Sequence, residues 1–187
     1  MIDPEPPVSG RSFLIRGERA NTPDAAAVRA VNLAAFPTDA EAKLLDALWA
    51  SGHYDPRLSL VAEMDGAVVG HGLLTATTLE RPDGSRVVGR VVALGPIAVM
   101  PAWQRRRIGA KLMHAALELC LREGIAAIVL LGHPTYYPRF GFGPARAQGL
   151  LPTEPWPDEA WMACRLPAWT PDDVGVVHYA RPFMEME

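Results

Sequence analysis

The sequence predicts an α/β fold, with a central, mostly antiparallel mixed sheet and helices on both of its faces. An apolar strand over residues 87–99, an amphipathic helix over 106–123 and a short apolar strand over 126–131 form a β-α-β unit. The two strands of such a unit should be parallel and joined by a right-handed crossover. The turn sequences Asp65-Gly66 and 82–84 (Pro-Asp-Gly) are typical of hairpins between antiparallel strands. Together these observations predict one parallel strand pair within an otherwise antiparallel sheet.

Periodicity and turn residues predict the other elements. Residues 1–11 are proline-rich and predict a flexible N-terminal tail, and residues 12–187 are expected to form a single domain. A helix over 23–36 should begin after Thr22, a typical N-cap, with Pro23 in its first position. Its buried face is expected to hold Ala27, Val31, Ala34 and Ala35. The further expected elements are a helix over 40–50 and strands over 12–16, 59–63, 68–79, 161–166 and 174–179.

The composition is that of an ordinary globular chain. It has 187 residues, of which 49% are hydrophobic and 21% charged, with a net charge of −3. A chain of this length buries about 70% of its unfolded surface, so it needs no disulfide or metal to fold, and we expect no metal site. The acidic balance argues against a nucleic-acid partner, so any anion site must be local.

The cysteines and the hydropathy of the sequence predict the cellular compartment of the protein. Cys120 and Cys164 are the only cysteines and lie in separate elements, which suits a reducing environment better than a disulfide framework. The first residues show no signal-peptide pattern, and no run approaches the ~20 apolar residues of a membrane span. We therefore expect a cytoplasmic protein without a membrane partner.

Residues 94–112 combine a broken strand, a basic turn and the start of a helix. Because Gly95-Pro96 interrupts the strand, it should bulge or splay there and leave the backbone groups of residues 97–99 free for another partner. The alternative is a purely structural bulge or an edge strand. The turn at 104–110 opens a helix, where backbone N–H groups favour an anion.

Three consecutive arginines, Arg105 to Arg107, lie in this turn. Cations destabilise a helix N-terminus, and a bound polyanion would reverse that effect; a solvated basic turn is the alternative. The turn has neither the Gly-Lys-Ser/Thr of a Walker A loop nor a complete Gly-x-Gly-x-x-Gly fingerprint. The two common nucleotide-binding loops are therefore disfavoured.

The segment 132–142 (Gly-His-Pro-Thr-Tyr-Tyr-Pro-Arg-Phe-Gly-Phe) follows the second strand of the β-α-β unit. Ligands of open α/β sheets bind beyond the carboxyl ends of parallel strands. His133, Tyr136 and Tyr137 are therefore expected beside a ligand. Alternatively, the tyrosines and Phe140 only pack beneath the loop.

In this order, the segments resemble the GNAT acetyltransferase superfamily, and 94–99 and 132–142 are most similar to its YhbS-like branch. The resemblance covers about residues 12–145 and includes a Tyr-x-x-x-Gly-Phe pattern that begins at Tyr137. It implies acetyl-CoA as cofactor and direct transfer of an acetyl group to a primary amine of a small molecule or protein. It also implies a monomer or homodimer.

The resemblance assigns site residues as well. The family's phosphate loop falls on 104–109, where Arg107 stands in place of the usual first glycine; if this position needs a positive φ, we expect a weaker or reshaped site. Tyr137 matches the family's general acid, and Ile97, Ala98 and Val99 match the strand that pairs with pantetheine. The full expected cofactor-binding set is Ile97, Ala98, Val99, Gln104, Arg105, Arg106, Arg107, Ile108, Gly109, Ala110 and Tyr136.

The general base stays open. Many relatives carry a glutamate on the strand before the loop, but residues 91–97 contain no acid. The remaining candidates are His71, His133, Glu80 and Glu41, with a water relay as a further possibility. The missing glutamate and Arg107 also leave room for a different class of protein, a non-catalytic acyl-CoA-binding module or sensor.

Overall fold

The computed structural model describes residues 13–20 and 22–185. The strands are β1 Phe13–Gly17, β2 Ser59–Met64, β3 Ala67–Glu80, β4 Arg86–Val99, β5 Ala127–Leu131, β6 Gly143–Pro144, β7 Leu150–Pro152, β8 Trp161–Arg165 and β9 Gly175–His178. The helices are α1 Asp24–Ala35, α2 Ala40–Ala50, α3 Ile108–Arg122 and the short α4 Arg181–Met184, with 3-10 turns between elements. The tail expected over residues 1–11 lies outside the described residues.

The described strands form one mixed sheet. Its main path runs β1-β2-β3-β4-β5-β8-β6, and β9 pairs with both β3 and β7. The expected parallel pair is β4 with β5, in register from Val91↔Ala127 to Ala93↔Val129. A short parallel pair between β7 and β9 was not expected. The other strand pairs are antiparallel, so the expected fold class is confirmed.

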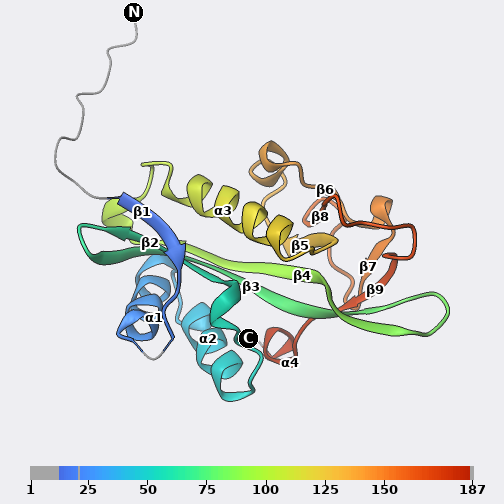
Figure 1. Cartoon of the computed structure of the whole chain (residues 1–187), viewed down its shortest axis with the longest axis horizontal. Coiled ribbons are helices and arrows are strands. Elements are labelled where there is room, and N and C mark those ends of the chain that lie inside the picture. The colour runs from blue at the N-terminus through green and yellow to red at the C-terminus, as the bar shows by residue number, and fades with distance from the viewer. Residues whose placement is uncertain (1–12, 21, 186–187) are drawn as a thin grey trace, which may run out of the picture.

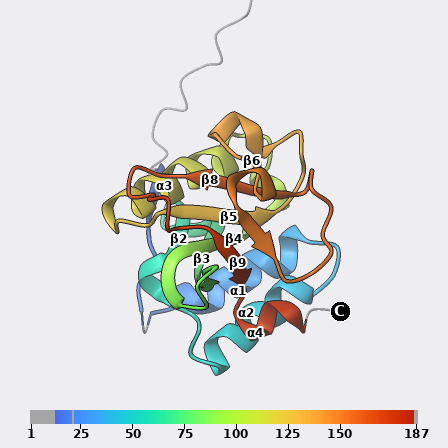
Figure 2. The same ribbon diagram turned by 90° about the vertical axis from the view of Figure 1, so that its right-hand side faces the viewer.

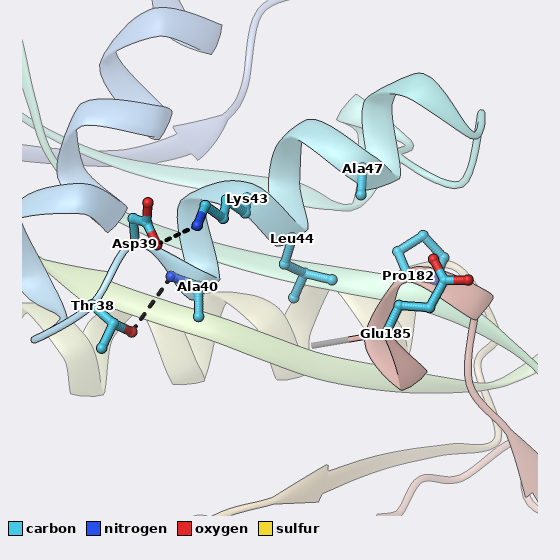
Figure 3. A pocket seen from close by; sticks show the side chains of 8 residues that line it. All are labelled: Thr38, Asp39, Ala40, Lys43, Leu44, Ala47, Pro182 and Glu185. Carbon is cyan, nitrogen blue, oxygen red and sulfur yellow. Dashed lines mark hydrogen bonds and ion pairs between the residues drawn. The ribbon is translucent and has the colours of Figure 1, made fainter. Parts of the chain in front are cut away.

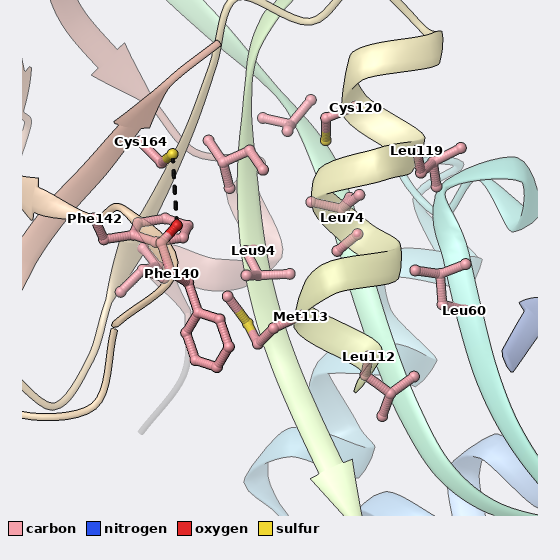
Figure 4. Close-up of a cluster of buried hydrophobic side chains, with 14 of the residues drawn as sticks. Leu60, Leu74, Leu94, Leu112, Met113, Leu119, Cys120, Phe140, Phe142 and Cys164 are labelled. Carbon is pink, nitrogen blue, oxygen red and sulfur yellow. Dashed lines mark hydrogen bonds between the residues drawn. The ribbon is translucent and has the colours of Figure 1, made fainter. Parts of the chain in front are cut away.

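Helices cover both faces of the sheet. The helix α3 lies on one face, and α1, α2 and α4 lie on the other (Figures 1 and 2). On the α3 face, Leu112 and Met113 pack with Leu74 and Leu94 of the central strands (Figure 4). On the opposite face, leucines of α2 cluster with Val28 of α1 and with residues of β2 and β3. The strands β3 and β4 therefore form a wall between two separate apolar layers.

The buried face of α1 differs from the expected one. Asp24, Val28, Val31 and Asn32 are buried, whereas Ala34 is exposed and Ala27 and Ala35 are only partly covered. The expectation followed apolar residues, but two polar side chains are buried because each has a partner. Asp24 pairs with Arg16, and Asn32 hydrogen-bonds to His71.

Within the described residues, no helix is long and apolar enough to cross a membrane.

Candidate active site

The strand β4 loses one neighbour where the sequence places its Gly-Pro break. Pairing with β5 ends at Ala93, whereas pairing with β3 continues to Val99. The register changes from Leu74↔Leu94 to Gly72↔Ile97, so β4 has one extra residue and forms a bulge at Gly95-Pro96. The expected bulge and splay are thus present.

The last residues of β4 present backbone groups on the side away from β3. The Met100 N–H donates to Val69 O of β3 at 2.9 Å. Peptide groups alternate in an antiparallel ladder, so those of Ile97 and Val99 face the opposite edge. There Gln104 Nε2 donates to Val99 O at 3.1 Å. The edge beyond the bulge can therefore pair with an extended ligand.

The basic turn is held in an unusual backbone conformation. Arg105 has a φ of 60° and Arg107 a φ of 61°. Arg107 is also the N-cap of α3, which begins at Ile108 rather than at the expected residue 106. A non-glycine residue in the left-handed region costs about 1–2 kcal/mol. The position where the family motif has glycine thus does require a positive φ here.

A cavity of about 330 Å³ lies between the basic turn at 104–110 and the loop at 132–142, called the tyrosine loop below. The expected residues that line it are Val99, Gln104, Arg105, Arg107, Ile108, Gly109, Ala110 and Tyr136. The expected residues Ile97, Ala98 and Arg106 lie outside this lining, although Ile97 continues the same open edge of β4. One wall of the cavity is thus the first turn of a 15-residue helix, with its free N–H groups.

Two lining residues, Trp103 and Arg139, were missed by the sequence analysis. The Arg139 guanidinium lies 4.6 Å from the centre of the Tyr136 ring, and its Nε donates to Tyr136 O at 2.9 Å. The Arg106 guanidinium lies 4.9 Å from the centre of the Trp103 ring. In both pairs the arginine follows the aromatic residue by three positions, and this spacing is the signal that could have found them.

The two tyrosines have different surroundings. An added Cβ at Gly109 would lie 3.6 Å from the Tyr136 hydroxyl, so this hydroxyl reaches the start of α3. The Tyr137 ring packs on the end of β5, where an added Cβ at Gly132 would be only 2.3 Å from Tyr137 Cε2. Burial, followed by the nearby Tyr136, raises the pKa of Tyr137 above its ordinary value. Tyr137 therefore keeps its proton at neutral pH and can donate it.

A second cavity, of about 500 Å³, lies between α2 and α4 (Figure 3). Leu44 and Pro182 contribute apolar surface to it, and Asp39 and Glu185 contribute carboxylates. Its one lysine, Lys43, is paired with Asp39 at 3.0 Å. This charge pattern does not suit a polyphosphate, so the smaller cavity is the better anion site.

Comparison with known proteins identifies the family of this chain. Residues 25–142 match the acetyltransferase (GNAT) family. The chain belongs to this family. The uncharacterized N-acetyltransferase YjhQ of Escherichia coli K12 is 34% identical over 163 residues, which cover 85% of this chain and 88% of YjhQ. The uncharacterized N-acetyltransferase YhbS of the same strain is 31% identical over 144 residues, which cover 76% and 82% of the two chains.

Two solved GNAT structures are similar to all or most of the chain. The crystal structure of Escherichia coli YhbS in complex with CoA has a TM-score of 0.83 and 29% identity, and covers 100% of this chain and 97% of YhbS. A GNAT acetyltransferase from Brucella melitensis in complex with acetyl-CoA has a TM-score of 0.71 and 32% identity, and covers 92% and 98%. The expected superfamily and YhbS-like branch are confirmed, and both complexes agree with the expected cofactor.

Among the candidate bases of this GNAT chain, His71 is fully buried beneath α1. Asn32 Nδ2 lies 2.9 Å from its Nδ1, and Ser59 Oγ lies 3.1 Å from its Nε2. Burial lowers the pKa of His71 to about 3. The prediction of His71 as the base is therefore not supported, because its ring is neutral, enclosed and bonded at both nitrogens.

The other candidates lie in three different places. Glu80 pairs with Arg86 and His178, and the Arg86 hydrogen bond is the main cause that lowers its pKa. It lies eight residues along β3 from Gly72, the partner of Ile97, which is roughly 26 Å at about 3.3 Å per residue. The structure therefore does not bring Glu80 to the site. His133 is exposed on the loop after β5, whereas Glu41 in the first turn of α2 has one buried carboxylate oxygen.

Proposed function

We propose that this GNAT chain is an acetyl-CoA-dependent N-acetyltransferase that transfers an acetyl group directly to a primary amine of a small molecule or protein. One observation carries the proposal. The open edge of β4 lies beside the cavity formed by the strained arginine turn and the tyrosine loop. In this proposal the start of α3 binds the phosphates, the edge of β4 pairs with the extended arm of the cofactor, and Tyr137 supplies a proton.

The first turn of α3 binds the pyrophosphate of acetyl-CoA in this proposal. Its free N–H groups and macrodipole attract the phosphate oxygens, and Arg105 and Arg107 add positive charge at the rim of the cavity. The left-handed φ of both arginines turns successive N–H groups toward one side, an arrangement that suits anions. Bound phosphate would offset the strain of this turn.

In the proposed reaction, Ile97 at the edge of β4 and Tyr137 act on the thioester of acetyl-CoA. The outward N–H of Ile97 donates to the thioester carbonyl oxygen and stabilises the negative charge that develops on it. The amine nitrogen forms a bond to the carbonyl carbon as the carbon–sulfur bond breaks. Tyr137 gives its proton to the departing sulfur and is reprotonated by the proton that the nitrogen loses. Acetyl-CoA and the neutral amine thus yield the amide and CoA.

A Tyr137→Phe variant tests this assignment. We expect it to lower kcat by about 100-fold or more, the usual range for a general acid, with unchanged affinity for CoA. Thiol release from acetyl-CoA measures turnover, and calorimetry measures the affinity. Tyr136→Phe is the matched control, because its hydroxyl reaches the start of α3 and its loss should weaken CoA binding rather than kcat. Unchanged turnover in Tyr137→Phe would remove this tyrosine from the acid role.

The alternative is a non-catalytic acyl-CoA-binding module. It is favoured by the absence of a carboxylate from residues 91–99 of β4. Tight CoA binding by the wild-type protein, without thiol release on any primary amine, would support this alternative and contradict the enzyme.

A further inference from the structure

Three side-chain oxygens on the α1 and α2 face of the sheet are buried without a partner in the described part of the chain. They are Asn32 Oδ1 of α1, Glu41 Oε2 of α2 and Thr75 Oγ1 of β3. Asn32 is fully buried and Thr75 is 2% exposed. Leaving a buried polar group unsatisfied costs about 1–3 kcal/mol, so three such oxygens on one face of the sheet call for an explanation.

The orientation of the Asn32 amide is fixed by its neighbours. Its Nδ2 donates to Val28 O at 2.8 Å and lies 2.9 Å from His71 Nδ1. A flipped amide would place Oδ1 against the Val28 carbonyl, so Nδ2 is the donor and His71 Nδ1 the acceptor. The His71 proton then lies on Nε2 and is donated to Ser59 Oγ. Oδ1 is consequently the atom of Asn32 that is left for a ligand.

Two of the three oxygens come from elements that meet near the β4 bulge, β3 and α1. His71 and Thr75 lie on the same face of β3 and pair with Ala98 and Ala93, on either side of the bulge. The helix α1, which carries Asn32 above His71, packs on both β3 and β4.

Glu41 belongs to the same layer. Leu45 of α2 clusters with Leu73, the β3 residue opposite the bulge. Glu41 lies one helical turn before Leu45 and so on the same side of α2. This placement puts Glu41 on the side of α2 that faces β3, opposite to α3.

We propose that Asn32, Glu41 and Thr75 bind the ammonium group of the acetyl acceptor, an inference that rests on the proposed acetyltransferase function. A primary ammonium has three N–H donors, and the three oxygens can accept one bond each. A carboxylate adds the charge complementarity that a neutral alcohol would not use. The acceptor is thus an aliphatic primary amine that enters in its protonated form, on the face of β4 opposite to the α3 layer.

Glu41 also removes the proton that blocks the attack. It takes one proton from the ammonium, which leaves a neutral amine with its lone pair free, and later releases that proton to solvent. The second proton that the nitrogen loses replaces the one that Tyr137 gives to sulfur. The overall reaction converts an ammonium and a thioester into an amide, a thiol and one free proton, so atoms and charge balance.

The test uses the full-length protein with Glu41→Gln and Thr75→Val. Asn32 is left unchanged because its Nδ2 also holds His71. The acceptors are ethanolamine, putrescine, n-hexylamine, L-lysine and a tetrapeptide with a free α-amino group. We expect each variant to raise KM for the amine by about 10- to 100-fold, the value of a hydrogen bond to a charged group, while the Kd for CoA is unchanged. Glu41→Gln should also lower kcat, because the variant cannot take the proton from the ammonium group.

Thr75→Val separates ligand binding from a structural role. Because the Thr75 hydroxyl has no partner among the described residues, the isosteric valine should leave Tm unchanged or raise it while KM for the amine increases. The control is Asp39→Asn, which neutralises a carboxylate just before α2 that already pairs with Lys43. This control should leave KM unchanged.

The outcomes separate the two proposals. If the wild-type protein turns over and both variants keep its KM for the amine, this inference is overturned and the proposed acetyltransferase function stands. A second outcome is that the wild-type protein shows no turnover but binds the amine in calorimetry, and that both variants weaken this binding. That outcome would overturn the proposed acetyltransferase function and support the ammonium site. No turnover and no amine binding with the wild-type protein would overturn both.

Discussion

The two faces of β4 form an instructive contrast. On the α3 face, the candidate cofactor site is made largely of backbone groups in one continuous segment, with exposed arginines in strained conformations. On the α1 and α2 face, the candidate acceptor site is made of buried side chains from three elements far apart in the sequence. A nucleotide held by backbone geometry therefore leaves a local sequence motif, whereas an amine held by converging side chains leaves none.

The largest expected effect tests whether burial beneath α1 keeps the His71 ring neutral. His71 has a pKa of about 3 in the folded protein, against about 6.5 when unfolded, so the unfolded state binds the proton first as pH falls. The stability linked to His71 is complete above about pH 6.5 and is lost toward pH 3. At 1.36 kcal/mol per pKa unit, the loss is about 5 kcal/mol.

Urea unfolding across this pH range measures the effect. His71→Gln should flatten the fall in unfolding free energy relative to wild type, whatever its stability at neutral pH. His133→Gln, which changes an exposed histidine, should follow the wild-type curve. Parallel curves for wild type and His71→Gln would show that burial does not hold this ring neutral.

A smaller effect is expected at the end of β5, where the α3 face positions Tyr137. In Gly132→Ala the new Cβ would lie 2.3 Å from Tyr137 Cε2, so the ring must move. We expect kcat for acetyl transfer to fall by about 10- to 100-fold, since misplacing a reacting group by about 1 Å has an effect of this size. The affinity for CoA should change little.

Gly143→Ala provides the matched control. Its Cβ would lie 3.6 Å from Gln148 Nε2, an ordinary contact. Equal turnover in the two alanine variants would mean that the position of the Tyr137 ring is not critical.

The smallest expected effect is that of Arg107→Gly, which tests whether backbone groups or side chains bind the cofactor on the α3 face. Glycine adopts the observed φ of 61° without strain, so Arg107→Gly should raise the free energy of unfolding by about 1 kcal/mol. If backbone N–H groups bind the phosphates, its Kd for CoA should stay within a few-fold of wild type. Chemical denaturation and calorimetry measure the two quantities. A loss of affinity above tenfold would assign the binding to the Arg107 side chain instead.

The same contrast explains what could be predicted from the sequence. Strong periodicity and turn residues predicted α2 over 40–50 and the hairpins at Asp65 and Asp83. The expected cofactor segment lines the cavity because its residues are neighbours in the chain. The short elements β6, β7 and α4 were missed, since two to four residues carry no periodicity and form through pairing or packing with distant segments.

The acceptor side could not be predicted for a related reason. The sequence indicated neither that Asn32 would be buried nor that Thr75 would lack a partner, because both depend on how α1 crosses the sheet. His71 and Glu80 were reasonable bases by chemistry, but one is enclosed beneath α1 and the other lies far along β3. Among the candidate bases, only Glu41 has a carboxylate oxygen that is buried without a partner, as Asn32 Oδ1 and Thr75 Oγ1 are.

The most direct test is to map CoA on the protein by amide chemical shifts in a 15N-labelled sample. If the cofactor binds on the α3 face, CoA should shift residues 97–99 and 104–110 together with Tyr136 and Tyr137. The amides that line the larger cavity between α2 and α4, such as Ala40 and Lys43, should stay unchanged (Figure 3). Shifts confined to that larger cavity, with the arginine turn unaffected, would contradict the cofactor site and the division of roles between the two faces of β4.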